Sequence, residues 1–471
     1  MSDARPQLNA AEAESFHYLE ALKYTGRAGA EAIDPWDPKA DSFMSGNAKV
    51  RADYTVAKEG GDFSSVQMAV SQAVRDAGTG KTGDRIYIAI HPGVYDETVI
   101  VPRLIVGDRS VAITLFGTGN APQETVIRAN IDQGMCGADF LATFGDAVDG
   151  YAPEIAEIYR ANAALERLST ENACVLRVEN DGFQAKNLSV KNAYNCDRAD
   201  RNSKCEDGKG GPKNAAGQFA KGWHQAVATL VHNADRVHFD HVRFSSFQDT
   251  LYFKGRVPGM TVRSYYSNCD VEGDIDFIFG RATAYFDRCE IRSLGSRVDH
   301  AYVVAPSTNM HTRYGIVFNE CDFTHDGSEA ALAGTFSLGR QWFQTVRASP
   351  YGIPNVKGYR TRLAETSEFD HPPEGTISLD VLEAVGKCVI LNSRIGAHIN
   401  PQAPWDDWSG GRRNADGEFV PGEWNTRYRP VQYSSDDFFC YLGDWLKGEG
   451  LVFHKPDPAE PWLAEFNNRR A

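Results

Sequence analysis

The sequence lacks long apolar runs and an excess of basic residues. No stretch approaches the ~18 consecutive apolar residues of a membrane span. Lysine and arginine number 49 against 63 aspartates and glutamates, a net charge of −14 over 471 residues. This balance argues against a nucleic-acid-binding protein, because phosphate contacts need a basic stripe. The first residues also lack the basic and apolar regions of a signal peptide. The chain is therefore either cytosolic or a mature form from which an export signal has been removed.

Cysteine is sparse and carries no zinc signature. The nine cysteines form no CxxC pair, and we find no cluster of histidine and cysteine with metal-ligand spacing. We expect neither a metal nor a cofactor. Cys196 and Cys205 lie in one polar loop, where a local disulfide and two free thiols are both open interpretations.

Helical periodicity is scarce as well. The best helix candidates are residues 11–24, 65–76 and 152–168. Most of the remaining chain consists of short β-branched and aromatic runs, such as RIYIAIHPGVY and VAITLFGTG, interrupted by glycine, asparagine and aspartate. Strands without intervening helices exclude a doubly wound α/β fold.

A weak repeat runs through these strands. Five short segments (KNLSV, DHVRF, SNCDV, DRCEI and NECDF) share a polar-to-apolar pattern, and their central residues are separated by 54, 27, 20 and 32 residues. Periods of roughly 20 to 50 residues indicate a solenoid, and strand-only units indicate a β-helix. The central residues are Leu188, Val242, Cys269, Cys289 and Cys321. Chance similarity among short patterns is the alternative.

The repeat predicts a domain organisation and a test of its register. We expect an N-terminal extension (1–50) packed on the solenoid, a β-helix domain (51–450) and a C-terminal tail (451–471). Cys269 and Cys289 should occupy the same inward slot on adjacent coils, about 4.8 Å apart along the sheet. That spacing allows either a disulfide or a pair of stacked free thiols.

Two aspartates interrupt apolar strands at equivalent places in the repeat. Asp249, in SSFQDTLYF, lies seven residues after Val242, and Asp276, in GDIDFIFG, lies seven after Cys269. Stacked carboxylates cannot both ionise cheaply, so one becomes a proton donor beside an anion. Alternatively, each aspartate caps a turn or pairs with an arginine. Strict strand alternation would place Gln248 and Asp249 on opposite faces, so a shared site needs a bend in the backbone.

At these residues the sequence resembles the pectin methylesterase (pectinesterase) family. Five motifs occur in family order between about residues 54 and 448. They are G-x-Y-x-E in PGVYDET, HQAVATL, FQDTLY, DFIFG and LGRQW. The last has Gln341 where the family usually has proline, which changes backbone stiffness and removes no reactive group.

The resemblance implies a right-handed parallel β-helix with short peripheral helices and long loops. It also implies the roles of the site residues. Asp276 would attack the methyl ester of a galacturonate unit in pectin, and Asp249 would act as acid and then as base. Gln225 and Gln248 would donate hydrogen bonds to the oxyanion, and Arg340 would bond Asp276. The residues expected to contact the sugar rings are Trp342, Phe279, Tyr252 and Tyr302.

Other interpretations of the same residues stay open. The glutamines could satisfy buried backbone groups, and the aromatic residues could be core. The rival functions are a related esterase or thioesterase acting on another ester, a pectate lyase or polygalacturonase, and a non-catalytic carbohydrate-binding solenoid. Loops 193–222, 344–376 and 404–424 are expected beside the cleft. Because pectin is extracellular, we expect a secreted or periplasmic monomer whose export segment is absent from this chain.

Overall fold

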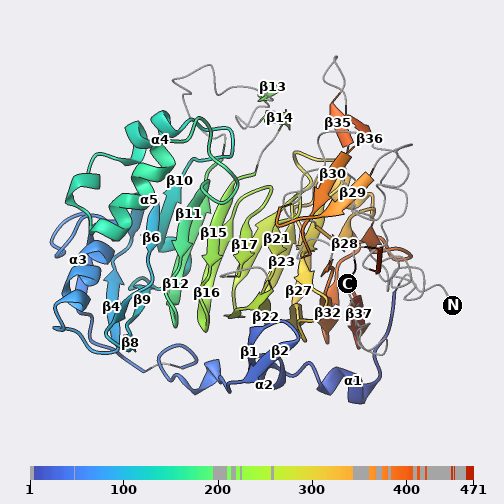
Figure 1. Ribbon diagram of the computed structural model, residues 1–471, viewed down its shortest axis with the longest axis horizontal. Coiled ribbons are helices and arrows are strands. Elements are labelled where there is room, and N and C mark those ends of the chain that lie inside the picture. The colour runs from blue at the N-terminus through green and yellow to red at the C-terminus, as the bar shows by residue number, and fades with distance from the viewer. Residues whose placement is uncertain are drawn as a thin grey trace.

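The computed structural model shows a column of short parallel strands stacked coil upon coil (Figure 1). It describes residues 5–46, 48–194, 209–213, 219–222, 225–255, 259–342, 360–366, 374–379, 383–406, 411–413, 419–421, 447–448, 450 and 463–471. The parallel β-helix predicted from the repeat is confirmed by the pairing of successive coils.

Three faces build the column. A sheet of 17 strands supplies two faces, because the long strands β12 and β16 bend and take part in both rows. The first row is β3 (Tyr54–Val56), β4 (Arg85–Ile90), β9 (Ala112–Gly117), β12 (Gln184–Asn192), β16 (Val237–Ser245), β19 (Arg263–Ser267), β22 (Thr283–Asp287), β26 (Ile316–Asn319), β32 (Cys388–Leu391) and β37 (Leu463–Phe466). The second row adds β5 (Gly93–Asp96), β10 (Thr125–Ala129), β20 (Asp270–Gly273), β23 (Glu290–Ser293), β27 (Asp322–His325), β33 (Arg394–Ile395) and β38 (Arg469–Arg470).

The third face is a separate eight-stranded parallel sheet. Its strands are β6 (Val99–Val101), β11 (Cys174–Val178), β15 (Val227–His232), β17 (Leu251–Lys254), β21 (Ile278–Gly280), β24 (Tyr302–Pro306), β28 (Ser337–Arg340) and β34 (Trp405–Asp406). A three-stranded sheet joins β1 (Tyr24–Arg27) to β2 (Ala30–Ile33) and β18 (Met260–Thr261). The two-stranded sheets are β7 (Ile105–Val106) with β8 (Arg109–Ser110), β13 (Lys209–Lys213) with β14 (Phe219–Gly222), and β25 (Thr308–Asn309) with β31 (Ala384–Val385). Two more are β29 (Arg360–Leu363) with β30 (Glu374–Ile377) and β35 (Gly411–Arg413) with β36 (Phe419–Pro421).

One corner of the column is a ladder of left-handed residues. Seven residues that occupy the same corner in successive coils have φ between 51° and 54°. Asparagine tolerates this conformation better than most residues, and the side-chain amides of Asn467, Asn392 and Asn319 hydrogen-bond in a row along the corner. The ladder consists of Asn187, His241, Asn268, Arg288, Glu320, Asn392 and Asn467.

The five predicted repeat positions each follow a residue of this ladder, which confirms their register. Leu188 is paired with Val242, and the strand pairs that follow Cys269, Cys289 and Cys321 keep the predicted offsets. The three cysteines are buried free thiols. Of the two alternatives for Cys269 and Cys289, the structure therefore has stacked thiols. The Cys196–Cys205 pair lies outside the described residues.

A second stack, of aromatic rings, fills the interior beside the thiols. Phe239, Tyr266, Phe286 and Phe318 are buried and stack in sequence with ring centroids 4.4 to 5.0 Å apart. Rings of register partners lie face to face because parallel strands repeat about every 4.8 Å. The same register thus produces both stacks.

Helices lie at the periphery. They are α1 (Ala10–Glu14), α2 (Tyr18–Ala21), α3 (Val66–Gly78), α4 (Gly137–Phe144), α5 (Pro153–Ala163) and α6 (Glu329–Leu332), with 3₁₀ turns η1 (Pro38–Ala40), η2 (Pro122–Glu124) and η3 (Val148–Gly150). Helices α3, α4 and α5 gather at the end of the column that holds β4 and β6, opposite the end near the N label (Figure 1). The predictions for 65–76 and 152–168 are confirmed, although α5 is shorter. The continuous helix predicted over 11–24 is wrong, because His17 has an extended ψ of 142° and separates α1 from α2.

The glutamate of the G-x-Y-x-E motif has a structural role. The Glu97 carboxylate accepts hydrogen bonds from the Ser65 hydroxyl and from the backbone amides of Val66 and Gln67, at 2.6 to 2.9 Å. It therefore caps the first turn of α3, where backbone N–H groups have no helical partner.

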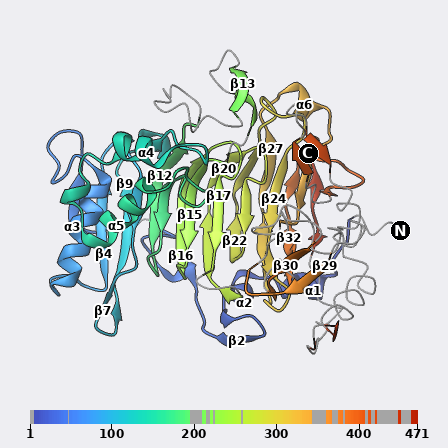
Figure 2. The same cartoon turned by 45° about the horizontal axis from the view of Figure 1, so that its top comes forward.

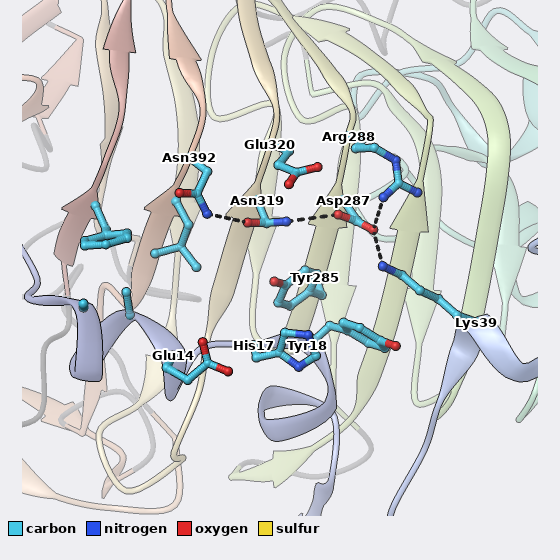
Figure 3. Close-up of a pocket in the computed structure, with 14 residues that line it drawn as sticks. Glu14, His17, Tyr18, Lys39, Tyr285, Asp287, Arg288, Asn319, Glu320 and Asn392 are labelled. Carbon is cyan, nitrogen blue, oxygen red and sulfur yellow. Dashed lines mark hydrogen bonds and ion pairs between the residues drawn. The ribbon is translucent and has the colours of Figure 1, made fainter.

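Residues 5–46, here called the N-terminal arm, run along the outside of the 17-stranded sheet (Figures 1 and 2). Apolar residues of the arm, including Leu8 and Phe16, form one buried cluster with Tyr265 and Tyr285 of the sheet. Between the arm and the side chains of Asn319 and Asn392 lies a hollow of about 450 Å³. Figure 3 shows Lys39 of the arm reaching across this hollow to Asp287, 2.9 Å away.

The column extends beyond the predicted boundary at residue 450. Strands β37 and β38 pair in parallel with β32 and β33, and so complete the last coil. The prediction that all of residues 451–471 form a tail is therefore wrong. The segment was missed because strands of only four and two residues leave too short a pattern to recognise.

The arm is fastened by one buried arginine, which gives a stability prediction. The Arg263 side chain is fully buried and bonds the carboxylates of Asp34 in the arm and Asp235 in the turn between β15 and β16, at 2.7 and 2.6 Å. Arg263→Met would leave these carboxylates without their shared cation. We expect it to lower the free energy of unfolding by about 3 kcal/mol, measured by urea denaturation.

The matched control is Arg236→Gln. Arg236 pairs with the same Asp34, but its side chain is 43% exposed, so its loss should cost at most about 1 kcal/mol. Equal effects of the two substitutions would contradict the assignment of Arg263 as the fastening.

Candidate active site

The two aspartates singled out in the sequence lie opposite each other on adjacent coils. The strands that flank Asp249, β16 and β17, pair with the strands that flank Asp276, β20 and β21, and the offset is 27 residues on both sides. The Asp249 amide also donates to the carbonyl of Ile275, at 3.0 Å. The predicted register of the aspartates is therefore confirmed.

The backbone bends at both aspartates. Asp249 has φ of 68° and Asp276 has φ of 50°, the left-handed region that costs a non-glycine residue on the order of 1 kcal/mol. Strict alternation therefore ends at Asp249, and it no longer forces Gln248 to the opposite face. Gln248 instead forms a parallel bridge with Gln225 of the preceding coil. The bend that a shared site requires is thus present.

Arg340 forms a bidentate ion pair with Asp276. Its Nε and Nη2 atoms donate to the two carboxylate oxygens at 2.8 and 2.7 Å. Burial by itself would lower the pKa of Arg340, but the adjacent Asp276 raises it overall. Asp276 is thereby presented as a carboxylate with fixed orientation. These residues are 64 positions apart, and the stacking of β28 near β21 brings them together.

Asp249 lies in a different electrostatic environment. It is 6% exposed, and burial raises its pKa well above the usual range, with a further rise from the negative charge of Asp276. The site therefore places a carboxyl group whose burial favours the protonated form beside an arginine-bonded carboxylate on the neighbouring coil. Such a pair can deliver a proton and a nucleophile to one substrate group.

The aromatic residues predicted to contact sugar rings divide into two groups. Tyr252 and Phe279 stack at 4.3 Å and are only 4% and 3% exposed, so they present little ring surface. Trp342 packs edge-on against both rings and is partly exposed. Tyr302 is also partly exposed and lies under the Arg340 guanidinium, 4.0 Å from the ring centroid. Trp342 and Tyr302 are therefore the better candidates for sugar contact.

The departure from the family motif at Gln341 is structural. Its side chain is buried, and Nε2 donates to the Ala384 carbonyl at 2.5 Å. Proline could not make this bond. The substitution therefore ties β28 to the segment before β32 and adds nothing to the reacting groups.

Sequence reasoning overlooked a second buried ion pair beside the site. Asp274 lies two residues before Asp276 and bonds Arg297. The signal was available, because Asp274 is another carboxylate in the GDIDFIFG segment, but nothing in the sequence points to Arg297. Within the described parts of the chain there is no group of three or more His, Cys, Asp or Glu side chains placed to hold a metal ion. No helix there is long and apolar enough to cross a membrane.

Several known proteins resemble this chain in sequence or in fold. A family model described as Pectinesterase matches residues 211–348. The chain is 30% identical over 419 residues to pectinesterase B of Dickeya dadantii (strain 3937), covering 86% of this chain and 87% of the relative. The solved structure of rice weevil pectin methyl esterase matches with a TM-score of 0.65 and 24% identity, covering 100% of this chain and 98% of that chain, which shows a shared fold.

A further relative has a different name. The putative acyl-CoA thioester hydrolase YbhC of Escherichia coli (strain K12) is 29% identical over 350 residues, covering 71% of this chain and 72% of the relative. The β-helix fold and these similarities together define a β-helix carboxylic ester hydrolase. The chain belongs to the pectinesterase family.

The buried Asp249 gives a pH-dependent prediction. Because its folded-state pKa is raised, the stability it contributes is present below its unfolded value of about 3.9 and is lost as pH rises through the folded value. Asp249→Asn mimics the protonated form at every pH. We expect the variant and the wild type to have the same free energy of unfolding near pH 4. At higher pH the variant should be the more stable, by about 1.4 kcal/mol for each pH unit by which the folded pKa of Asp249 exceeds its unfolded value.

Urea denaturation between pH 4 and pH 8 measures this difference. Asp276→Asn is the comparison, and it should be destabilising at neutral pH because it breaks the bond to buried Arg340. A pH-independent effect of Asp249→Asn would show that its carboxyl group has an ordinary pKa.

Proposed function

We propose that this protein hydrolyses the methyl esters of galacturonate units in pectin, with Asp276 as nucleophile and Asp249 as acid and base. The observation that supports this most directly is the pairing of an arginine-bonded carboxylate with a buried carboxyl group of raised pKa on the next coil. Ester hydrolysis through an acyl-enzyme needs these two states side by side.

The proposed first step forms the acyl-enzyme. A carboxylate oxygen of Asp276 attacks the ester carbonyl carbon, and the carbonyl oxygen becomes an oxyanion. When this intermediate collapses, the bond to the methoxy oxygen breaks, and Asp249 gives its proton to that oxygen, so that methanol leaves. The product of this step is an anhydride between Asp276 and the galacturonate carbonyl, beside an ionised Asp249.

The second step restores the enzyme. Asp249, now a base, takes a proton from water as the water oxygen attacks the acyl carbon. The anhydride bond breaks, Asp276 returns to its carboxylate form and bonds Arg340 again, and the sugar keeps a free carboxylic acid. The side-chain amides of Gln225 and Gln248, on adjacent coils, would stabilise the oxyanion in both steps, a contribution of about 3 kcal/mol per donor.

A second candidate is hydrolysis of a thioester, supported by the similarity to a relative named as a putative acyl-CoA thioester hydrolase. The acyl chemistry would be the same, but a thiolate leaves without prior protonation far more readily than methoxide does. Asp249 would then be less important for the first step. Pectate lyase and polygalacturonase activities are less well supported, since neither uses an acyl-enzyme.

The deciding measurement is methanol release from highly methyl-esterified pectin. Asp276→Asn should lower kcat by at least about 10³-fold, because it removes the nucleophile. Asp322→Asn is the matched control: this aspartate lies on the same solenoid in an exposed pair with Arg394 and should change kcat less than about twofold. Each variant is checked for folding by circular dichroism.

The same samples separate the candidate functions. Thiol release from acyl-CoA without methanol release would favour the thioester hydrolase. Unsaturated products would indicate a lyase, and binding without turnover, unchanged in Asp276→Asn, would indicate a carbohydrate-binding solenoid.

Pectin as substrate also carries a proposal about location. Because pectin is an extracellular polymer, we place the working protein in the periplasm or outside the cell, acting as a monomer. Cell fractionation against periplasmic and cytoplasmic markers, followed by size-exclusion chromatography, measures both; a purely cytoplasmic protein would contradict the proposal.

A further inference from the structure

A buried ion pair beside the aspartates has no part in the proposed steps. The side chains of Asp274 and Arg297 are 0% and 3% exposed, and two hydrogen bonds of 2.8 Å join them. Removing two charges from water is costly, and a well-packed apolar pair of the same size is often as stable or more so. Stability alone is therefore a weak reason for this pair.

The position of Asp274 ties three coils together next to the nucleophile. Its backbone amide donates to the Phe247 carbonyl at 3.0 Å, and its carbonyl accepts from the Tyr302 amide at 2.9 Å. Its carboxylate also accepts from the backbone amide of Ile275, at 2.6 Å. These bonds hold the chain just before the left-handed turn at Asp276.

Arg297 reaches the coil that carries the other aspartate. Its guanidinium lies 5.2 Å from the ring centroid of Phe247 and 5.9 Å from that of Tyr194. Phe247 is two residues before Asp249. Arg297 therefore contacts Phe247, which lies just before Asp249, and bonds Asp274, which lies just before Asp276. Asp274 compensates the positive charge of Arg297.

Two ion pairs act on the pKa of Asp249: their aspartates raise it and their arginines lower it. Asp276 and Asp274 are negative, and Arg340 and Arg297 are positive. Each arginine bonds one aspartate of the segment 274–276, so these four described groups together carry no net formal charge. Removing either member of the Asp274–Arg297 pair would leave one uncompensated charge close to Asp249 in a medium that screens poorly.

We infer that Asp274 and Arg297 form a positioning pair for the ester hydrolysis proposed above, on which this inference rests. The pair orients the turn that carries Asp276 and keeps the charge around Asp249 balanced, so that Asp249 can exchange its proton in both directions during turnover. Neither residue touches the reacting atoms.

The test follows the proton of Asp249 directly. The probe is the ¹³C resonance of its carboxyl carbon, assigned by comparison with Asp249→Asn and titrated with pH in protein labelled at aspartate. Arg297→Met removes a nearby cation and should raise the titration midpoint, whereas Asp274→Asn removes a nearby anion and should lower it. Each shift should be at least about half a pH unit.

Two further variants separate charge from packing. Arg297→Lys keeps the cation but loses the bidentate geometry. The titration midpoint of Asp249 in this variant should stay within about half a pH unit of the wild-type value. The double variant Asp274→Asn with Arg297→Met removes both charges and should return the midpoint to near that of wild type. If Arg297→Met does not fold, the comparison of Asp274→Asn with the double variant decides alone.

Shifts in the same direction, or no shift in Asp274→Asn, would overturn the inference and leave the pair a purely structural one. The alkaline limb of the pH profile of kcat/KM for methanol release should follow the same midpoints, because the first step needs protonated Asp249. If the wild type releases no methanol, the proposed function fails, yet the carboxyl titration still tests the charge balance.

Discussion

Parallel backbone hydrogen bonding between coils is the constraint on which the rest of the structure depends. Each coil must place its amides opposite the carbonyls of the next, so equivalent residues lie about 4.8 Å apart along the column. That register lines up the left-handed corner, the buried thiols and the interior rings. It also lines up Asp249 and Asp276. Core and candidate site therefore share one register, and a slip of one residue would disrupt both.

Charge within the wall of the column is distributed unevenly, and this unevenness gives the site its chemistry. Buried carboxylates are costly unless they are paired. Arg340 and Arg297 bond Asp276 and Asp274, whereas none of the described arginines bonds Asp249. Burial raises the pKa of Asp249 well above its usual range, and it also raises the pKa of Asp274 despite the bond to Arg297. The arrangement gives up stability at neutral pH in exchange for a proton donor next to an anion.

Several family motifs proved to have structural roles. Glu97 caps helix α3, and Tyr252 and Phe279 cover each other. A motif shows that residues are needed together, but it does not separate those that contact a substrate from those that support the coil. The partial exposure of Trp342 makes it a better candidate for substrate contact than Tyr252 or Phe279.

The sequence by itself determined the repeat, its register and the pairing of the two aspartates. These depend on equal spacings within neighbouring coils, such as the seven residues that separate each aspartate from its repeat position. Only the tertiary structure decided which arginine meets which aspartate, since Arg340 is 64 positions from Asp276 and the loops between coils vary in length. It also decided the bend at Asp249, the attachment of the arm through Arg263 and the last coil after residue 450. The physical reason is that a pattern records local periodicity, whereas ion pairs and bends depend on how separate coils pack in space.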